Sequence, residues 1–268
     1  MKTITEIVAI YGARAQASDQ IKGRMRNLRD YYNGDVIIPL PEINSDEQSA
    51  VANLLAQGLD QTAMRIASTR PDIYCPPADV ARKRSRDNSE IKRKALFGWW
   101  EHSRMDLQMS KRARYLIGYA TTVSHLRWNP TTQCPEWHLR DPLTAYPATL
   151  LGVEDMRPRD CIFAYERPLG YLHQMYPEAA SVFQSNSDAG PDQAIEMIEY
   201  VDENETVLIA MRGPVQTGLF GTSSTMDDNI VLELERIPNR LGQAPVVCAQ
   251  RISLDGAQGQ FDGILGMY

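Results

Sequence analysis

The sequence predicts an α+β fold in which long helices come first and a mostly antiparallel sheet region follows. Two observations support this prediction. Apolar residues recur at helical spacing within residues 1–118, and short runs rich in β-branched and aromatic residues follow from residue 119 onward. With 268 residues, of which 43% are hydrophobic, the chain can bury a core. No stretch approaches the roughly 18 consecutive apolar residues of a membrane-spanning helix, and residues 1–6 do not read as a secretory signal.

The first two predicted helices lie within residues 1–69. Thr5 is expected to cap a helix that runs toward Tyr32, where Asn33-Gly34-Asp35 provides a C-cap and a turn. The second helix is expected to cover residues 46–69, because four apolar residues at helical spacing form one stripe along it. These residues are Leu55, Leu59, Ala63 and Ile66.

A strongly basic helix is expected to begin at Asp79, and a break at residues 103–106 separates it from a further helix over residues 107–118. Between residues 82 and 114 the sequence contains 11 Lys and Arg and 4 Asp and Glu. Six of these basic residues are candidates for a contact surface: Arg82, Arg84, Arg86, Lys92, Arg93 and Lys94.

The spacing of Arg82, Arg86 and Arg93 places these three side chains on one face of a helix. Such a face could lie against phosphates without reading bases, or it could meet the acidic part of a neighbouring copy. A solvated face is the third interpretation, because most runs of charge have no partner. The sequence leaves all three open.

Six strands are predicted after residue 118, and the polar residues 202–205 form a turn that joins two of them into an antiparallel hairpin. One helix, over residues 169–183, interrupts the strands. Residues 213–229 are rich in Gly, Ser and Thr and predict a mobile loop. The predicted strands are residues 119–128, 136–140, 161–167, 194–201, 206–212 and 230–237.

The chain divides into residues 1–118, residues 119–252, and residues 253–268, where a turn leads into the start of an apolar helix. Charge is also distributed unevenly. Residues 1–130 contain 20 Lys and Arg and 14 Asp and Glu, whereas residues 131–268 contain 8 and 20. This asymmetry suggests two faces that meet different partners or neighbouring subunits, and two ordinary solvated surfaces are the alternative.

Motifs that carry catalysis are missing from the sequence. It contains no GxxxxGK[ST], GxSxG or HExxH pattern. Four cysteines without a CxxC pair are expected to be reduced thiols, and His125 and His138 are expected to be ordinary residues within strands. Asp227 and Asp228 lie in the predicted loop, which does not hold the fixed geometry that metal-assisted chemistry needs. We therefore expect no catalytic, cofactor-binding or metal-binding residue, and no enzymatic activity.

Five short segments occur in a characteristic order along the chain. The first three are Arg29-Asp30-Tyr31-Tyr32-Asn33-Gly34-Asp35, Asn53 with Leu59-Asp60-Gln61-Thr62-Ala63, and Trp99-Trp100 through Met105-Asp106-Leu107 with Gly118-Tyr119-Ala120. The last two are Arg140-Asp141-Pro142 with Tyr146-Pro147, and Asn239-Arg240-Leu241-Gly242-Gln243-Ala244-Pro245-Val246-Val247. Together they resemble the portal proteins of tailed bacteriophages, in particular the type typical of siphophages that infect Gram-positive hosts. In that family, alanine or glycine stands where Ala120 precedes the sheet.

The resemblance implies a structural, non-enzymatic subunit of a homo-oligomeric ring, usually of twelve copies, at one capsid vertex of the virion. The ring is assembled in the host cytoplasm and forms the channel for DNA packaging and ejection. The implied partners are other copies, the major capsid protein, the scaffolding protein, the terminase large subunit, the head-tail adaptor and, without sequence preference, double-stranded DNA. No membrane and no cofactor are implied.

The resemblance also implies that residues 1–252 belong to the wing region of such a subunit and that residues 253–268 begin a stem helix. The remaining stem, the clip and the crown are then expected in a longer protein. A ring gives the uneven charge a physical role, because each subunit meets its neighbours through two different patches.

Two alternatives remain open from the sequence. One is a metal-dependent nucleic-acid-processing enzyme that uses Asp227 and Asp228. The other is a non-catalytic DNA-binding module that uses residues 82–94, whose binding is expected to weaken steeply as salt rises.

Overall fold

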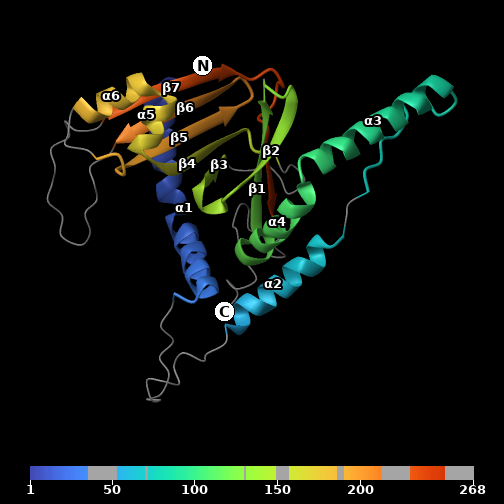
Figure 1. The fold of residues 1–268 in the computed structure, drawn as a ribbon, viewed down its shortest axis with the longest axis horizontal. Helices are drawn as coiled ribbons and strands as arrows, with labels where there is room; N and C mark the ends of the chain where they lie inside the picture. The colour runs from blue at the N-terminus through green and yellow to red at the C-terminus, as the bar shows by residue number, and fades with distance from the viewer. Residues whose placement is uncertain are drawn as a thin grey trace, which may run out of the picture. The chain divides into compact units, whose positions relative to one another are not determined.

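The computed structural model describes residues 1–35, 53–69, 72–129, 131–148, 157–185, 190–212 and 230–250 (Figure 1). These residues form an α+β structure with N-terminal helices and two antiparallel sheets, as the sequence predicts. The predicted loop at 213–229, the predicted helix start within 253–268, and residues 46–52 of the second predicted helix lie outside the described residues.

The described residues fall into two compact units. The first unit comprises residues 1–20 and 143–248, and the second comprises residues 21–142 together with residues 249 and 250. Helix α1 (Ile4–Asn33) therefore contributes its first half to one unit and its second half to the other.

The first unit is built on a five-stranded antiparallel sheet in the order β3-β4-β5-β6-β7. The predicted hairpin is confirmed, since Val201 pairs with Thr206. Its turn is closed by the Asp202 carboxylate, which accepts hydrogen bonds from the backbone amides of Asn204 at 2.7 Å and Glu205 at 2.8 Å. The strands are β3 (Ala145–Pro147), β4 (Asp160–Pro168), β5 (Ala194–Asp202), β6 (Glu205–Arg212) and β7 (Ile230–Pro238).

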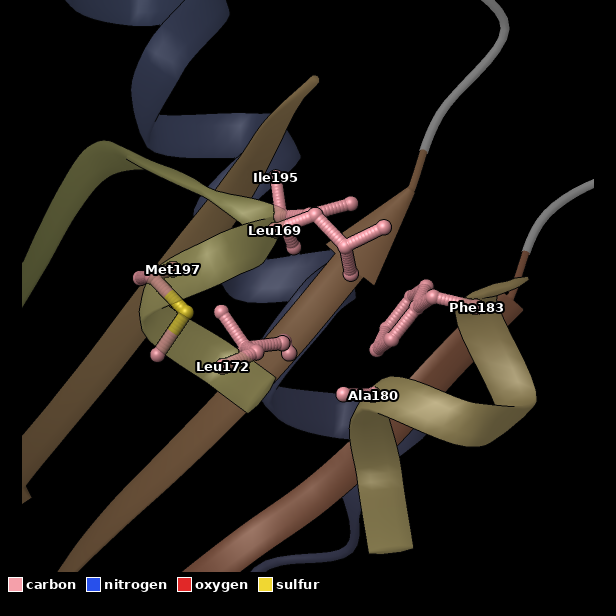
Figure 2. Packing of buried hydrophobic residues seen from close by; sticks show 7 residues of the cluster. Leu169, Leu172, Ala180, Phe183, Ile195 and Met197 are labelled. Atoms are coloured by element: carbon pink, nitrogen blue, oxygen red, sulfur yellow. The ribbon is translucent and has the colours of Figure 1, made fainter. Parts of the chain in front are cut away.

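Side chains alternate between the two faces of this sheet along each strand. Both faces are covered by helices. Ile198 and Tyr200 of β5 pack with Ile7 of α1. The residues of the opposite phase along the strand, Ile195 and Met197, pack against helices α5 (Leu169–Met175) and α6 (Pro177–Ser185). Figure 2 shows this second layer, in which the helices contribute Leu169, Leu172, Ala180 and Phe183.

Several helix boundaries differ from the prediction. Helix α2 (Leu54–Ala67) begins at Leu54, with Asn53 as its N-cap, and not at residue 46. The single helix expected over residues 169–183 is two helices separated at Tyr176, because the residue before a proline is disfavoured in helical conformation and Pro177 follows. At the N-terminus, Thr3 rather than Thr5 caps α1. The Glu6 carboxylate accepts from the Thr3 backbone amide at 2.7 Å, and the Thr3 hydroxyl accepts from the Glu6 amide at 3.3 Å, which is a capping box.

The second unit combines helices with a small sheet in the order β2-β1-β8. Helix α2 packs on α4, and a Cβ added at Gly118 would lie 3.5 Å from Leu59 Cδ1, an ordinary van der Waals contact. Strands β1 and β2 form a hairpin, and the Thr121 hydroxyl donates to the carbonyl of Ala249 in β8 at 3.2 Å. The elements that lie wholly in this unit are α2 (Leu54–Ala67), α3 (Lys83–His102), α4 (Met105–Tyr119), β1 (Thr121–Asn129) and β2 (Cys134–Arg140). Two elements belong partly to each unit, a 3-10 turn (Pro142–Thr144) and β8 (Val246–Gln250).

The break between the two long helices is confirmed within the predicted span. Helix α3 ends at His102 and α4 begins at Met105, with Arg104 in the left-handed region at φ 48°. Among the helices that the structure describes, none has the length and apolar content that crossing a bilayer requires.

Candidate functional site

The predicted basic residues lie on or beside α3, a helix with little support from its own unit. Of its twenty residues, Trp100 is buried and most others are exposed, including Ile91 at 63%. Its last turn is fixed by two indole donors. Trp99 donates to the Pro135 carbonyl at 2.7 Å, and Trp100 donates to the Asp106 carboxylate at 2.8 Å.

Residues 72–81, which we call the strap, run along the exposed part of α3. The Asp79 backbone amide donates to the Ser85 hydroxyl at 3.0 Å, and the Ser89 hydroxyl donates to the Cys75 carbonyl. The two serines are four residues apart and so share one face of the helix. Asp79 was expected to open the helix. Instead its carboxylate accepts from the Ala81 amide at 2.9 Å in a turn within the strap, and α3 begins at Lys83.

The six candidate cations fall into two groups, those with an acidic partner among the described residues and those without one. Arg82 is paired with Asp79 at 3.1 Å and Arg93 with Asp72 at 3.2 Å, so two cations of the expected stripe have acidic partners in the strap. Lys94 is paired with Glu90 on α3 itself at 2.9 Å. Within the part of the chain that the structure describes, Arg84, Arg86 and Lys92 have no ion-pair partner.

A shallow cavity of about 250 Å³ lies between the strap and α3. Pro76 and Pro77 of the strap form one wall. The other wall is polar and cationic, and none of the described residues that line it is Asp or Glu. This wall contains Arg82, Arg84, Ser85, Asn88, Ser89 and Lys92.

A polar junction joins α1, α2 and α4 in the second unit. The Asn53 side chain accepts from the Ala56 amide at 3.0 Å, which caps α2, and donates to the carbonyls of Tyr31 at 2.9 Å and Tyr32 at 3.0 Å at the end of α1. The Asp60 carboxylate of α2 accepts from the Tyr32 hydroxyl at 3.0 Å and pairs with Arg114 of α4 at 2.6 Å. Burial, followed by the hydrogen bond to Asp60, raises the pKa of Tyr32. Three segments that are distant in the sequence thus meet at two residues, Asn53 and Asp60.

A second ionic network lies in the first unit and has no local signal in the sequence. Asp160 of β4 lies 3.7 Å from Lys2 Nζ and 2.5 Å from Arg14 Nη2, the latter as an ion pair without hydrogen-bond alignment. Lys2 Nζ also donates to the Tyr200 hydroxyl, which itself donates to Asp202 at 2.9 Å. Burial, then the charge of Asp160, raises the pKa of Tyr200. Lys2 and Arg14 both pair with Asp160 of β4, so the network ties the N-terminal residues to the sheet.

No group of three or more His, Cys, Asp or Glu among the described residues is placed to hold a metal ion, and Asp227 and Asp228 lie outside them. His125 is buried in β1 opposite His138 of β2, as expected for residues within strands. Burial, with the charge of Arg140, lowers the pKa of His125 to about 3.

All four cysteines are free. Cys161 and Cys248 are buried, whereas Cys75 and Cys134 are half-buried, and none of the four closes a disulfide. Burial raises the pKa of Cys248 to about 12, which keeps this thiol protonated and unreactive.

The chain matches no protein-family model, and a search of the curated proteins finds no similar sequence.

Proposed function

We propose that this chain is a structural subunit of the portal ring of a tailed bacteriophage and that it acts through shape, without bond chemistry. In this proposal, copies of the chain surround a channel at one capsid vertex, through which double-stranded DNA is packaged and ejected. The major capsid protein, scaffolding protein, terminase large subunit and head-tail adaptor are its proposed partners. Residues 1–252 are assigned to the wing region.

The observation that carries the proposal is where the family-like segments lie in the fold. Asn53 and Asp60, from the second segment, hold the end of α1 against α2 and α4. Ala120, from the third, has φ 57° at the passage from α4 into β1, a left-handed conformation that favours glycine. Ala120 is also buried, so a side chain much larger than a methyl group would overpack this position. The family's preference for alanine or glycine at this place therefore has a physical reason here.

The fifth segment also lies at a junction. Asn239 organises the turn between β7 and β8, since its side chain donates to the carbonyls of Asp202 and Gln243 at 2.8 Å each and accepts from the Leu241 amide at 2.9 Å. Gly242 in the same turn has φ 66°, a conformation that strains other residues. Residues that set chain direction are the ones expected to be shared between proteins of one fold.

Exposed apolar surface on the second unit supports self-association. Large apolar side chains that are at least 63% exposed recur on its helices and strap, and in the proposed ring neighbouring copies would remove part of this apolar surface from water. They are Leu54, Met64, Tyr74, Val80, Ile91 and Leu107.

Charge supports the same mode of assembly. The described residues of the second unit contain 18 Lys and Arg and 11 Asp and Glu, whereas those of the first unit contain 8 and 13. A head-to-tail contact in a closed ring brings different patches of neighbouring copies together, so opposite charge on the two units favours it.

Electron microscopy of the purified chain tests the proposal. We expect ring-shaped particles with rotational symmetry in top views. Leu107→Asp, at an exposed site on α4, is expected to reduce the fraction of rings, whereas the matched control Leu241→Asp, at an exposed turn of the first unit, is expected to keep it. Monomers alone at micromolar concentration would contradict the proposal.

A cleavage assay tests the competing enzyme hypothesis. Plasmid DNA incubated with the protein and Mg²⁺ is expected to stay intact. Cleavage that disappears in the Asp227→Ala, Asp228→Ala variant would replace the structural proposal with the metal-dependent enzyme.

A further inference from the structure

We propose that the cavity between the strap and α3 binds a phosphate group of a nucleic-acid backbone, with Arg84 and Lys92 as its cationic contacts. Phosphate binding at this cavity does not depend on ring formation. A monomer that binds phosphate through these residues satisfies the proposal, and a ring that does not bind phosphate refutes it without affecting the proposed function.

The charge balance at the cavity is the first argument. Arg84 and Lys92 border the same cavity, and within the described residues neither has a carboxylate partner. The acids of the strap are already engaged, Asp79 with Arg82 and Asp72 with Arg93. The cavity therefore presents two unneutralised cations to one space, which favours an anion with several oxygen atoms.

The spacing along the helix is the second argument. Arg84, Asn88 and Lys92 follow one another at intervals of four residues, which places them in one row along α3. A rise of about 1.5 Å per residue puts the backbones of Arg84 and Lys92 about 12 Å apart, with Asn88 between them. Two long cationic side chains can approach the same oxyanion from both sides, while the Asn88 amide offers a neutral donor at the centre.

The strap makes the cavity a formed site rather than an open patch of charge. The Ser85 hydroxyl accepts a hydrogen bond from the strap and the Ser89 hydroxyl donates one to it, so the strap is held on the helix at two successive turns. The exposed ion pair between Arg93 and Asp72 adds a weaker contact at its beginning. Pro76 and Pro77 have restricted backbones, so their wall keeps its shape. A site that is already in place before binding spares the ligand the free energy of ordering it.

The cations outside the cavity favour a nucleic acid over an isolated phosphate. Lys83 and Arg86 lie on other sides of the same helical turns and also have no ion-pair partner within the described residues. A chain of phosphates can reach these residues as well as the cavity, whereas a single phosphate cannot. Contacts of this kind carry no sequence information, so binding is expected to be independent of base sequence.

Fluorescence anisotropy with a labelled DNA duplex at several salt concentrations tests the proposed site. The Arg84→Gln, Lys92→Gln variant is expected to bind about tenfold more weakly or worse, and the slope of log affinity against log salt is expected to fall by about one for each phosphate that the variant no longer neutralises. Asn88→Leu, which changes no charge and fills the cavity, is also expected to weaken binding. Far-UV circular dichroism and the melting temperature verify that each variant is folded.

Lys94→Gln is the matched control. It removes one positive charge from the same helix, at a lysine that is paired with Glu90 and does not line the cavity, and is expected to change affinity less than about twofold. Equal reductions in affinity for Lys94→Gln and for Lys92→Gln alone would show a diffuse basic surface and overturn the site. Absence of binding to DNA and to inorganic pyrophosphate at low salt would also overturn it. Binding of pyrophosphate without DNA would retain the phosphate site and assign it to a free phosphate compound.

Discussion

Replacing Arg236 of β7 with methionine is expected to destabilise the first unit by about 3 kcal/mol. Arg236 lies 2.7 Å from the carboxylates of both Glu205 and Glu233, and it donates to the Lys2 carbonyl at 3.3 Å. The hydrogen bonds to the two glutamates raise the pKa of Arg236 above its ordinary value, so it is charged throughout the stable pH range. Its removal leaves the Glu205 carboxylate, with a side chain 2% exposed, without a cation.

The magnitude follows from burial. Breaking a buried ion pair by removing one partner costs about 3–5 kcal/mol, because the remaining charge is left in a poorly solvated place. Glu205 keeps the hydrogen bond from the Lys2 backbone amide at 3.1 Å, and the Arg236 side chain is 21% exposed, so the lower end of that range applies. The contact with the more exposed Glu233 adds less than about 1 kcal/mol.

Urea unfolding monitored by circular dichroism measures this destabilisation, with a double-mutant cycle to isolate the pair. Glu205→Gln and the double variant complete the cycle, and we expect a coupling energy of at least about 1.5 kcal/mol. Arg240→Met, at an exposed position shortly after β7, is the control and is expected to cost less than about 0.5 kcal/mol. A destabilisation below about 1 kcal/mol for Arg236→Met, with an unchanged dependence on urea, would refute the reasoning.

Two further predictions concern the second unit. Burial lowers the pKa of His125 in the folded chain to about 3, whereas the pKa of a histidine in the unfolded chain is about 6.5. Between pH 7.5 and pH 5 the unfolded chain therefore binds a proton at His125 and the folded chain does not, so the free energy of unfolding is expected to fall by about 2 kcal/mol. Urea unfolding at both pH values should show that the free energy of unfolding of the His125→Asn variant depends less on pH. Asn53→Ala is expected to cost about 2 kcal/mol, about half from the missing cap of α2 and the rest from the carbonyls of Tyr31 and Tyr32. Asn53→Ser, which retains a capping oxygen, should recover about 1 kcal/mol, and equal destabilisation by both variants would contradict this assignment.

Local patterns in the sequence predicted most elements, and the misses have identifiable causes. The strand predicted over residues 230–237 corresponds to β7, and the polar turn over residues 202–205 predicted the β5–β6 hairpin. Strands β3 and β8 have three and five residues, too short for a periodic signal, and were not predicted. Pro177 was a signal for the break between α5 and α6 that the prediction of one helix overlooked.

The candidate site was only partly predictable. The sequence indicated which residues of α3 are basic, and their spacing indicated which lie on one face. It did not indicate that Asp72 and Asp79 of the strap neutralise Arg93 and Arg82, which leaves Arg84 and Lys92 as the cations of the cavity. Pairing of this kind depends on how the strap folds back along the helix.

Fold class, the presence of the longer helices and strands and the net charge of each region follow from the amino-acid order, because periodicity and capping act over a few neighbouring residues. The partners of the charged side chains do not. Lys2 meets Asp160, and Asn53 joins two helix ends, through contacts that exist once distant segments have packed together. A carboxylate or a cation changes its role with the charge that packing brings within a few ångströms, since electrostatic energy falls with distance in space and not with separation along the chain.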